Sequence, residues 1–370
     1  MNRCYLTEAF KVPNDYRIPP NEALKFDTQH PELNSQEYCY EVSKYRAPKD
    51  YLPVYSSIRQ NDHGLFIIAT NDFTTCVNGG VLAGDYNFNN FATSDLKSAK
   101  FSAVHKDTLL DLYYLDDITF IATTSSNTIE LYSTKAPVTL EKDNHQDIFC
   151  FIKIASKLTD GRVNCLSQFY EKNRMIIGTS NGHFECYECD SKELFQSFSL
   201  PYGHSAEITG IDTHPSVDLN WVSTSYDKSS LLWDRRQVHP ASTLIDNHHD
   251  QLTDVKWIKD EIIILSDAVG NLMVFDTRNV KDPLSKTKVL NRSINSLNFD
   301  KSNKMFGVIS ESCNTYIYEI DEKNELKQIH EHNAHPNMLY SLCFDVKKPN
   351  TYYVVGEGKY AKEVTITQES

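Results

Sequence analysis

The string His183-x-x-Cys186-x-x-Cys189 is the first place where residue types and spacing allow chemistry. A Cys-x-x-Cys pair beside a histidine can bind zinc or carry out thiol redox reactions. A closed zinc site needs a fourth ligand, usually from a second pair, and the sequence offers none at a suitable spacing. Residues three apart on a strand also point to opposite faces. We therefore interpret both cysteines as ordinary strand residues.

A second group that could ligate a metal is His330, His332 and His335. His335 is explained by a repeat register described below, which leaves two loop histidines in solvent. The same register explains His248 of the pair His248-His249. The sequence therefore predicts no metal site and no bound cofactor.

The motifs of common enzyme classes do not occur in the sequence. Gly79-Gly80 and Gly84 do not form a phosphate-binding loop, and there is no Gly-x-Ser-x-Gly elbow. Carboxylates are numerous but are scattered through predicted turns. We predict no catalytic residues and a protein that is not an enzyme.

The elements that must position these residues follow a repeat, best preserved between Gly203 and Arg236. It begins with Gly203-His204 and ends with Trp233-Asp234, the pattern of one WD40 propeller repeat. Three strand-like runs lie between them, separated by residues that favour chain reversal. These runs pass through Ile208, Ile211 and Thr213, then Asn220 to Ser225, then Ser230 to Trp233. We predict a structural tetrad of hydrogen-bonded side chains in this blade, formed by His204, Ser223, Asp227 and Trp233.

The same register recurs along the chain. Aromatic residues fall at the Trp233 position every 42 to 55 residues or so, roughly the period of propeller blades; they are Tyr132, Tyr187, Phe275 and Tyr318. Histidines recur at the His204 position as His105, His248 and His335, with Thr159 and Leu290 there in two other repeats. The turn aspartate is replaced by Ser126, Asn181 and Ser312 in other repeats, so we expect packing to stabilise those blades.

An irregular first blade and a final blade complete the count. We expect the first to contain a strand at Gly64 to Thr70, a turn at Asn78-Gly79-Gly80 and a strand from Val81 to Phe88. The fold class predicted is all-β: a seven-bladed WD40 β-propeller over residues 41–370, with an N-terminal extended arm over residues 1–40. Closure of the ring should bring the N- and C-terminal strands into one blade.

Composition narrows the class of partner. The formal net charge of −13 argues against direct binding to nucleic acid and suits a basic protein partner. The sequence contains no run of 18 or more apolar residues, so we predict no membrane span. The N-terminus has no apolar segment typical of a secretory signal. The nine cysteines fall mostly in apolar strands, which predicts reduced thiols in a cytoplasmic or nuclear protein.

Several segments resemble one family within the propellers, the WD-repeat subunit of the methylosome. The most similar stretch is Ile208 to Ser242, especially Ser229 to Arg236 running on to His239-Pro240-Ala241-Ser242. Arg17-Ile18-Pro19-Pro20-Asn21 is similar to the family's Leu-Pro-Pro-Asn segment, and Glu41 to Arg46 and Leu82-Ala83-Gly84 resemble its first blade. Where the family carries a tryptophan before Ala-Gly, this chain has Leu82, and Tyr51 to Asp62 reads as an insertion in the first loop.

The resemblance implies a non-catalytic adaptor that forms a hetero-oligomer with a type II (symmetric) protein arginine methyltransferase. It implies Arg-rich protein substrates such as Sm-type Arg-Gly tails, histone tails or germline RNA-granule proteins. The candidate partner-binding residues are Ile18, Pro19, Pro20, Leu82, Tyr86 and Phe88. Tyr86 and Phe88 stand in for the missing tryptophan, although both could instead fill the blade core. There are two alternative functions: a scaffold propeller of a nuclear-pore or trafficking complex, and a peptide-targeting receptor.

Overall fold

The structure is a computed structural model that describes thirteen stretches of the chain. They are residues 54–72, 78–84, 101–105, 107–133, 152–171, 173–189, 193–259, 261–300, 305–310, 314–321, 323–333, 338–357 and 360–366. The chain divides into two compact units, Met1–Asp50 and Tyr51–Ser370, and all the described residues belong to the second. The predicted arm of residues 1–40 lies outside the described residues, so its boundary stays a prediction.

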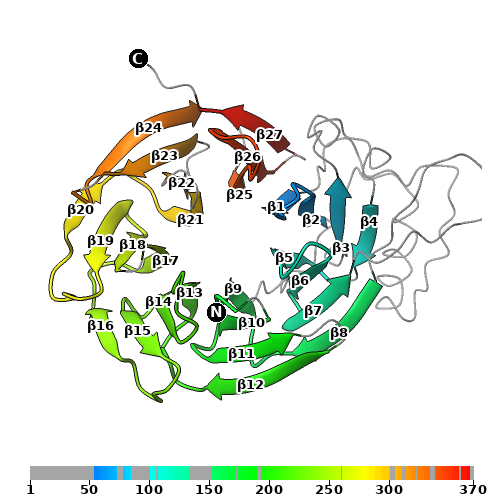
Figure 1. The fold of residues 1–370 in the computed structure, drawn as a ribbon, viewed down its shortest axis with the longest axis horizontal. Coiled ribbons are helices and arrows are strands. Elements are labelled where there is room, and N and C mark those ends of the chain that lie inside the picture. The colour runs from blue at the N-terminus through cyan, green and yellow to red at the C-terminus, as the bar shows by residue number, and fades with distance from the viewer. Residues whose placement is uncertain are drawn as a thin grey trace, which may run out of the picture. The chain divides into compact units, whose positions relative to one another are not determined.

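The described residues form seven antiparallel sheets of consecutive strands, six with four strands and one with three. In Figure 1 the first strand of each sheet lies nearest the centre of a ring and the last strand lies at the rim. The prediction of an all-β propeller is confirmed. No helix among the described residues has the length and apolar character needed to cross a membrane.

The strands of the first three sheets are β1 (Val54–Gln60), β2 (Phe66–Asp72), β3 (Asn78–Gly84), β4 (Phe101–His105); β5 (Leu109–Tyr114), β6 (Thr119–Thr124), β7 (Thr128–Ser133), β8 (Ile152–Leu158); β9 (Val163–Gln168), β10 (Arg174–Thr179), β11 (Phe184–Cys189) and β12 (Leu194–Leu200). Those of the fourth and fifth are β13 (Ile208–Thr213), β14 (Asn220–Ser225), β15 (Ser230–Asp234), β16 (Ser242–Ile245); β17 (Leu252–Lys259), β18 (Ile262–Asp267), β19 (Asn271–Asp276) and β20 (Ser285–Lys288). Those of the last two are β21 (Ile294–Asp300), β22 (Met305–Ser310), β23 (Asn314–Ile320), β24 (Leu326–Asn333); β25 (Leu339–Phe344), β26 (Thr351–Gly356) and β27 (Tyr360–Thr365).

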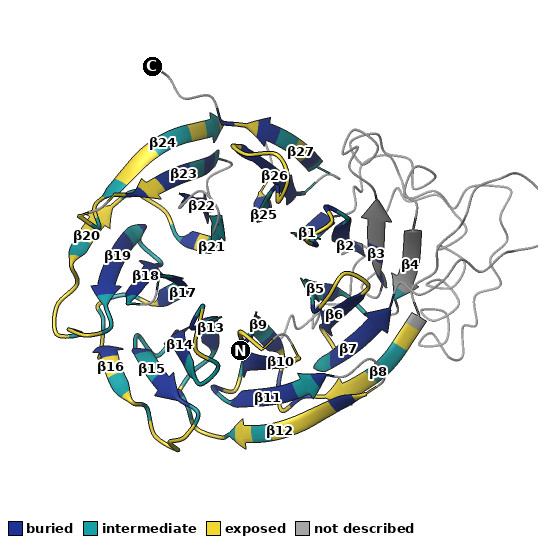
Figure 2. Cartoon of the chain, viewed as in Figure 1, coloured by how far each residue is buried: buried dark blue, intermediate teal, exposed yellow. Residues whose placement is uncertain are grey.

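The core of the propeller lies between neighbouring blades. Second strands such as β18 and β22 are buried along their whole length because a blade packs against each of their faces. One apolar cluster joins Ile264 and Val274 of the fifth blade to Ile294 and Val308 of the sixth. Outer strands such as β12 and β20 are mostly exposed, as the yellow bands at the rim of Figure 2 show. Each blade is therefore stable only with its neighbours.

Backbone N–H groups on the inner strands donate hydrogen bonds to side chains of the preceding blade. One edge of an inner strand pairs with the second strand, and the other edge faces the centre of the ring (Figure 1). Buried N–H groups at that edge need other acceptors. The acceptors are Asp254 Oδ2 for Leu297 N at 2.7 Å, Asp212 Oδ2 for Trp257 N at 2.8 Å, Ser167 Oγ for Thr213 N at 3.2 Å and Ser341 Oγ for Ile58 N at 3.3 Å.

Side chains of the first and last sheets close the ring. Ile58 and Phe66 of the first sheet pack against Tyr353 and Val355 of the last, and the rings of Phe66 and Tyr353 meet edge to face at 4.5 Å. The expected blade shared by N- and C-terminal strands does not occur among the described residues, where β25, β26 and β27 form the last sheet by themselves.

Two expectations about the first blade are wrong. Asn78-Gly79-Gly80 is not a turn but the start of β3, where Gly79 pairs with Asn71 on one side and His105 on the other. A side chain at position 79 would collide with the carbonyl oxygen of Asp107, so this glycine serves close packing. The supposed insertion of residues 51–62 contains β1, which is the inner strand of the blade.

The bond between Asp254 and Leu297 gives a stability prediction. Asp254 is buried, burial raises the pKa of its carboxyl group, and its two oxygens accept hydrogen bonds from Val255 N and Leu297 N. Asp254→Ala leaves both N–H groups unsatisfied, so the free energy of unfolding in urea should fall by about 1–3 kcal/mol. Asp282→Ala, in an exposed loop of the same blade, should change it by less than about 0.5 kcal/mol. Equal losses in the two variants would contradict this role of Asp254.

Candidate functional site

The fourth blade brings together the four side chains of the predicted tetrad. His204 lies in the loop before β13, Ser223 in β14, Asp227 in the turn after β14 and Trp233 in β15. His204 Nδ1 lies 2.9 Å from Asp227 Oδ2, and His204 Nε2 lies 2.7 Å from Ser223 Oγ. Trp233 Nε1 donates to the same Ser223 Oγ at 2.9 Å. The chain of hydrogen bonds therefore runs from the loop, across the second strand, to the third strand.

The turn around Asp227 is built to hold its carboxylate in the ionised form. Burial favours the neutral acid, but hydrogen bonds from His204, Ser229 and the Ser205 backbone N–H hold the pKa of Asp227 well below its usual range. Lys228 turns the chain with a φ of 70°. The carboxylate thus fixes both the turn and the histidine ring.

The order Asp227, His204, Ser223 has the hydrogen-bond geometry of a nucleophilic triad, but it is inaccessible. Ser223 is fully buried, and the His204 side chain has no exposed surface. Ser223 Oγ also accepts the Trp233 indole N–H. A substrate carbonyl could reach Ser223 only by displacing the core of the blade, so the arrangement stabilises the fold and offers no nucleophile.

Histidines at the His204 position pair with carboxylates in two other blades, each in a different way. His105 at the end of β4 has its Nε2 atom 2.8 Å from Oε2 of Glu130 in the second blade. In the fifth blade His248 Nε2 lies 3.2 Å from Asp267 Oδ2. Asp267 is the last residue of β18, which corresponds to Ser225 of β14 and not to the turn aspartate. His335 lies outside the described residues.

Glutamates two residues before a tyrosine are an element that our sequence reasoning missed. The Tyr132 hydroxyl donates to Glu130 Oε2 at 2.6 Å, and the Tyr187 hydroxyl donates to Glu185 Oε2 at 2.5 Å. These tyrosines occupy the Trp233 position, and each glutamate takes over the acceptor role of Ser223. The shared Glu-x-Tyr spacing of the two repeats was visible in the sequence and could have indicated this replacement.

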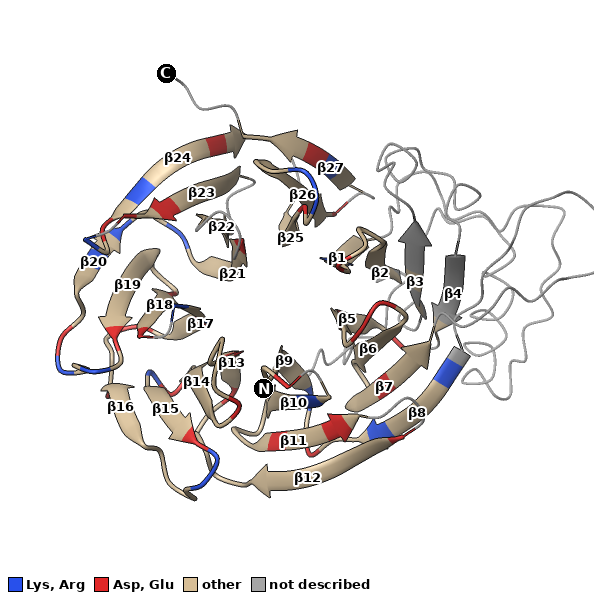
Figure 3. Cartoon of the chain, in the orientation of Figure 1, with Lys and Arg blue, Asp and Glu red and all other residues tan. Residues whose placement is uncertain are grey.

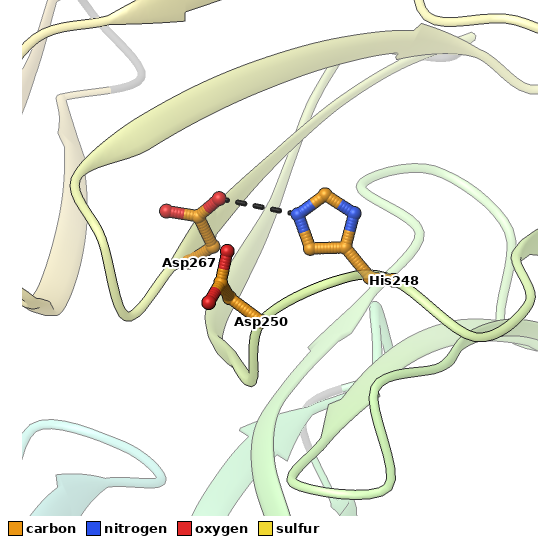
Figure 4. Close-up of side chains that lie close together, drawn as sticks. All are labelled: His248, Asp250 and Asp267. Atoms are coloured by element: carbon orange, nitrogen blue, oxygen red, sulfur yellow. Dashed lines mark hydrogen bonds and ion pairs between the residues drawn. The ribbon is translucent and has the colours of Figure 1, made fainter.

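One group in the described part of the chain has donor atoms close enough to hold a metal ion: His248, Asp250 and Asp267. Figure 4 shows the His248 ring bonded to the Asp267 carboxylate, with Asp250 alongside. Both oxygens of Asp267 already accept hydrogen bonds from Val269 N, Asn271 N and Asn271 Nδ2. A metal would have to displace these donors, so we interpret the group as the polar chain of the fifth blade.

The cysteines of the His-x-x-Cys-x-x-Cys string lie on opposite faces of β11. Cys186 packs in the cluster that contains Trp221 and Trp233, whereas Cys189 packs with Met175 and Leu194. Burial raises the pKa of the Cys186 thiol, which favours the unreactive neutral form. The two sulfurs therefore share neither a metal nor a redox reaction.

The described part of the chain contains little of the candidate partner-binding surface. Leu82 is a residue of β3, and its backbone is paired with Ile68 of β2 and Ser102 of β4. Ile18, Pro19, Pro20, Tyr86 and Phe88 lie outside the described residues. Their role in binding stays a prediction.

A cavity of about 430 Å³ lies where the inner strands of several blades begin, lined by residues that include Asn164, Thr209 and Tyr226. The charged residues of its lining are Arg162 and Glu207, which form an ion pair at 2.5 Å. Asn164 Nδ2 also donates to the same Glu207 oxygen, at 2.6 Å. The cavity therefore offers hydrogen-bonding groups but no net charge.

Comparisons with known proteins place the repeats among WD-repeat proteins. No protein-family model matches the chain. Methylosome protein WDR77 of Xenopus laevis is 24% identical over 208 residues, which are 55% of this chain and 61% of that protein. Histone acetyltransferase type B subunit 2 of Eremothecium gossypii is 23% identical over 206 residues, which are 55% of this chain and 48% of that protein. The chain thus spans less than two thirds of the length of these relatives.

Solved structures with the same fold include a chain of the mitotic checkpoint complex and a chain of the COPII outer coat vertex. The first has a TM-score of 0.64 over 87% of this chain and 95% of its own length. The second has a TM-score of 0.68 over 86% and 85%. Both are 13% identical in sequence, so they establish the fold alone. The chain is a WD40-repeat propeller.

Asp227 should matter more for stability than a histidine outside the register. Asp227→Ala leaves His204, Ser229 and the Ser205 N–H without their acceptor, so it should cost about 1–3 kcal/mol of unfolding free energy. His249→Ala removes an exposed ring and should cost far less. Thermal melting of the two variants checks this, and equal shifts would exclude the tetrad as a stabilising unit.

The His105–Glu130 pair should make stability depend on pH. Burial opposes ionisation of Glu130, but hydrogen bonds from His105, Lys153 and Tyr132 lower its pKa to about 2. The bond to Glu130 raises the pKa of His105 despite its burial. The glutamate contribution is complete above about pH 4.5 and fades as the pH falls towards 2, while the histidine contribution is complete below about pH 6.5 and fades above it.

Glu130→Gln should therefore lower the melting temperature most between about pH 4.5 and 6.5, and less on either side. Melting curves of wild type and variant from pH 2.5 to 8.5 measure the difference. A difference that does not vary with pH would mean that the pair does not ionise as described.

Proposed function

We propose that this chain is a non-catalytic adaptor that binds a type II protein arginine methyltransferase and presents Arg-rich protein substrates to it. The observation that carries the proposal is the similarity to the methylosome protein WDR77 over 208 residues. It agrees with the segments that resemble the methylosome subunit, namely residues 208–242 in the fourth blade and Leu82-Ala83-Gly84 in the first blade.

The physical properties of the described propeller support a binding role. Its Ser-His-Asp arrangement is buried in the fourth blade, and the cysteines of the Cys-x-x-Cys string are buried as well. In Figure 3 the positions of charged residues include loops and the third strands of the blades, and second strands such as β14 and β22 carry none. With a net charge of −13, the chain attracts Arg-rich segments over a distance of about one Debye length.

Three finer points belong to the same proposal. The three-stranded sheet β25–β27 counts as the seventh blade. The methyltransferase binds through the N-terminal arm and the first blade, by way of Ile18, Pro19, Pro20, Leu82, Tyr86 and Phe88. The complex works in the cytoplasm and the nucleus.

Capture of the enzyme tests the proposal directly. The purified chain, immobilised, should retain a type II arginine methyltransferase, should increase methylation of an Arg-Gly peptide by that enzyme, and should transfer no methyl group when incubated alone. Absence of capture would exclude the adaptor role and favour a scaffold propeller of a nuclear-pore or trafficking complex. Methylation by the chain alone would contradict a non-catalytic function.

Tyr86 and Phe88 should contribute to this capture as aromatic anchors. The double variant Tyr86→Ala/Phe88→Ala should retain at least tenfold less methyltransferase, with a melting temperature near that of the wild type. The matched control is Phe195→Ala/Tyr202→Ala, which removes two aromatic side chains that are 51% and 86% exposed in the third blade and the loop after it. Unchanged capture by the first variant would remove these two residues from the interface.

A further inference from the structure

Hydrogen bonds tie together the loops that join the first and second strands of five consecutive blades. We call this surface the inner-loop face; its loops are residues 61–65, 115–118, 169–173, 214–219 and 345–350. The connecting bonds are Val346 N to Gln60 Oε1 at 2.8 Å, Asn61 Nδ2 to Asp117 O at 3.0 Å, Gln168 Nε2 to Leu115 O at 3.3 Å and Glu171 N to Asp218 Oδ1 at 3.0 Å. The loops are therefore held in place before any partner arrives.

The same loops expose apolar side chains. Four of the five carry one: Ile118 is 42% exposed, Tyr170 65%, Val217 39% and Val346 54%. Single exposed apolar residues are ordinary on a protein surface, but here one lies on each of four loops, three of them in consecutive blades. Rigid apolar groups of this kind are the usual anchors of a protein interface because little conformational entropy is lost on binding.

A cavity of about 320 Å³ opens within this face, lined by residues of the first three blades. Three aspartates of its lining are exposed: Asp62, Asp116 and Asp117. Asp117 Oδ2 lies 2.9 Å from His63 Nε2, and Asp116 Oδ1 accepts hydrogen bonds from two backbone N–H groups of its own loop, which leaves the second oxygen of each carboxylate to face a ligand. Among its described lining residues the one lysine or arginine is Arg59, whose Nη2 lies 2.9 Å from both carboxylate oxygens of Asp111. With Arg59 neutralised by Asp111, the cavity carries a net negative charge, unlike the cavity at Arg162 and Glu207.

Tyr114, which also lines this cavity, has a buried hydroxyl group. The Tyr114 hydroxyl is shielded from solvent and has no hydrogen-bond partner among the described residues. Burial raises the pKa of this hydroxyl, so it remains a neutral donor and acceptor. An unpaired buried hydroxyl destabilises the free protein, and a ligand that reaches it recovers that loss.

We propose that this cavity binds an arginine side chain of an extended protein segment, and that apolar residues beside that arginine pack on Ile118 and Tyr170. The guanidinium suits the site better than an ammonium because its planar fork of donors can bond several carboxylates at once. The inference rests on the proposed function, since it assigns the Arg-rich substrates to a place on this chain. It can be tested without the methyltransferase.

The experiment measures binding of a fluorescein-labelled peptide of Arg-Gly repeats with flanking leucines to the full chain, by fluorescence anisotropy. The triple variant Asp62→Asn/Asp116→Asn/Asp117→Asn keeps side-chain shape and one acceptor oxygen at each position but removes three charges, so its Kd should rise at least tenfold. The matched control, Asp246→Asn/Asp282→Asn/Glu325→Gln, removes three charges from exposed loops elsewhere and should change Kd less than about twofold. Ile118→Ser/Tyr170→Ser should weaken binding at high salt as well as at low salt.

The outcomes separate this inference from the proposed function. A peptide in which citrulline replaces arginine should bind at least tenfold more weakly than the arginine peptide. Equal losses of peptide affinity in the acidic triple variant and its control would show that only the net charge of the protein matters, and would overturn the cavity as the binding site. Capture of the methyltransferase without peptide binding would overturn the inference and leave the proposed function standing. Peptide binding without capture of the enzyme would support the site and overturn the adaptor role.

Discussion

The inner strands of the propeller depend on acceptors that their own blades do not supply. Each inner strand has one edge directed at the centre of the ring, where a sandwich or a closed barrel would have another strand. Asp254, Asp212, Ser167 and Ser341 lie one blade away from the N–H groups they satisfy. The apolar clusters also bridge neighbouring blades. The ring as a whole is therefore the unit that folds, and the first blade is held to the last by Ile58 and Ser341.

The polar chains inside the blades vary much more than these bonds between blades. His204 pairs with a turn aspartate, His105 with a glutamate on the third strand and His248 with an aspartate at the end of the second. All three solutions fix a histidine that lies before an inner strand with a buried or half-buried carboxylate. Their diversity fits a role in holding loops, because a chemical reaction would demand the same geometry each time. This is why a Ser-His-Asp set in the fourth blade does not indicate an enzyme.

The sequence predicted the regular part of this fold well because propeller blades repeat. A single well-preserved repeat at Gly203–Asp234 located the strands of its own blade, and the register of Tyr132, Tyr187, Phe275 and Tyr318 located others. Prediction failed where local signals have two explanations. Gly79 reads as a turn residue, but it is required by its closeness to Asp107. The inner-loop face could not be foreseen, because Val346 and Gln60 are far apart in the sequence and meet only when the ring closes.

The account treats the propeller as a rigid platform whose loops are ordered by bonds between blades. Amide hydrogen exchange of the free protein, resolved to single residues, tests this claim most directly. The N–H groups of Thr213, Trp257 and Leu297 lie on strand edges that have no neighbouring strand. They should nevertheless exchange only through global unfolding, at the slow rate that the free energy of unfolding sets. Exchange at these three positions as fast as at exposed loop amides would show that the inner edges open independently, and would contradict the account.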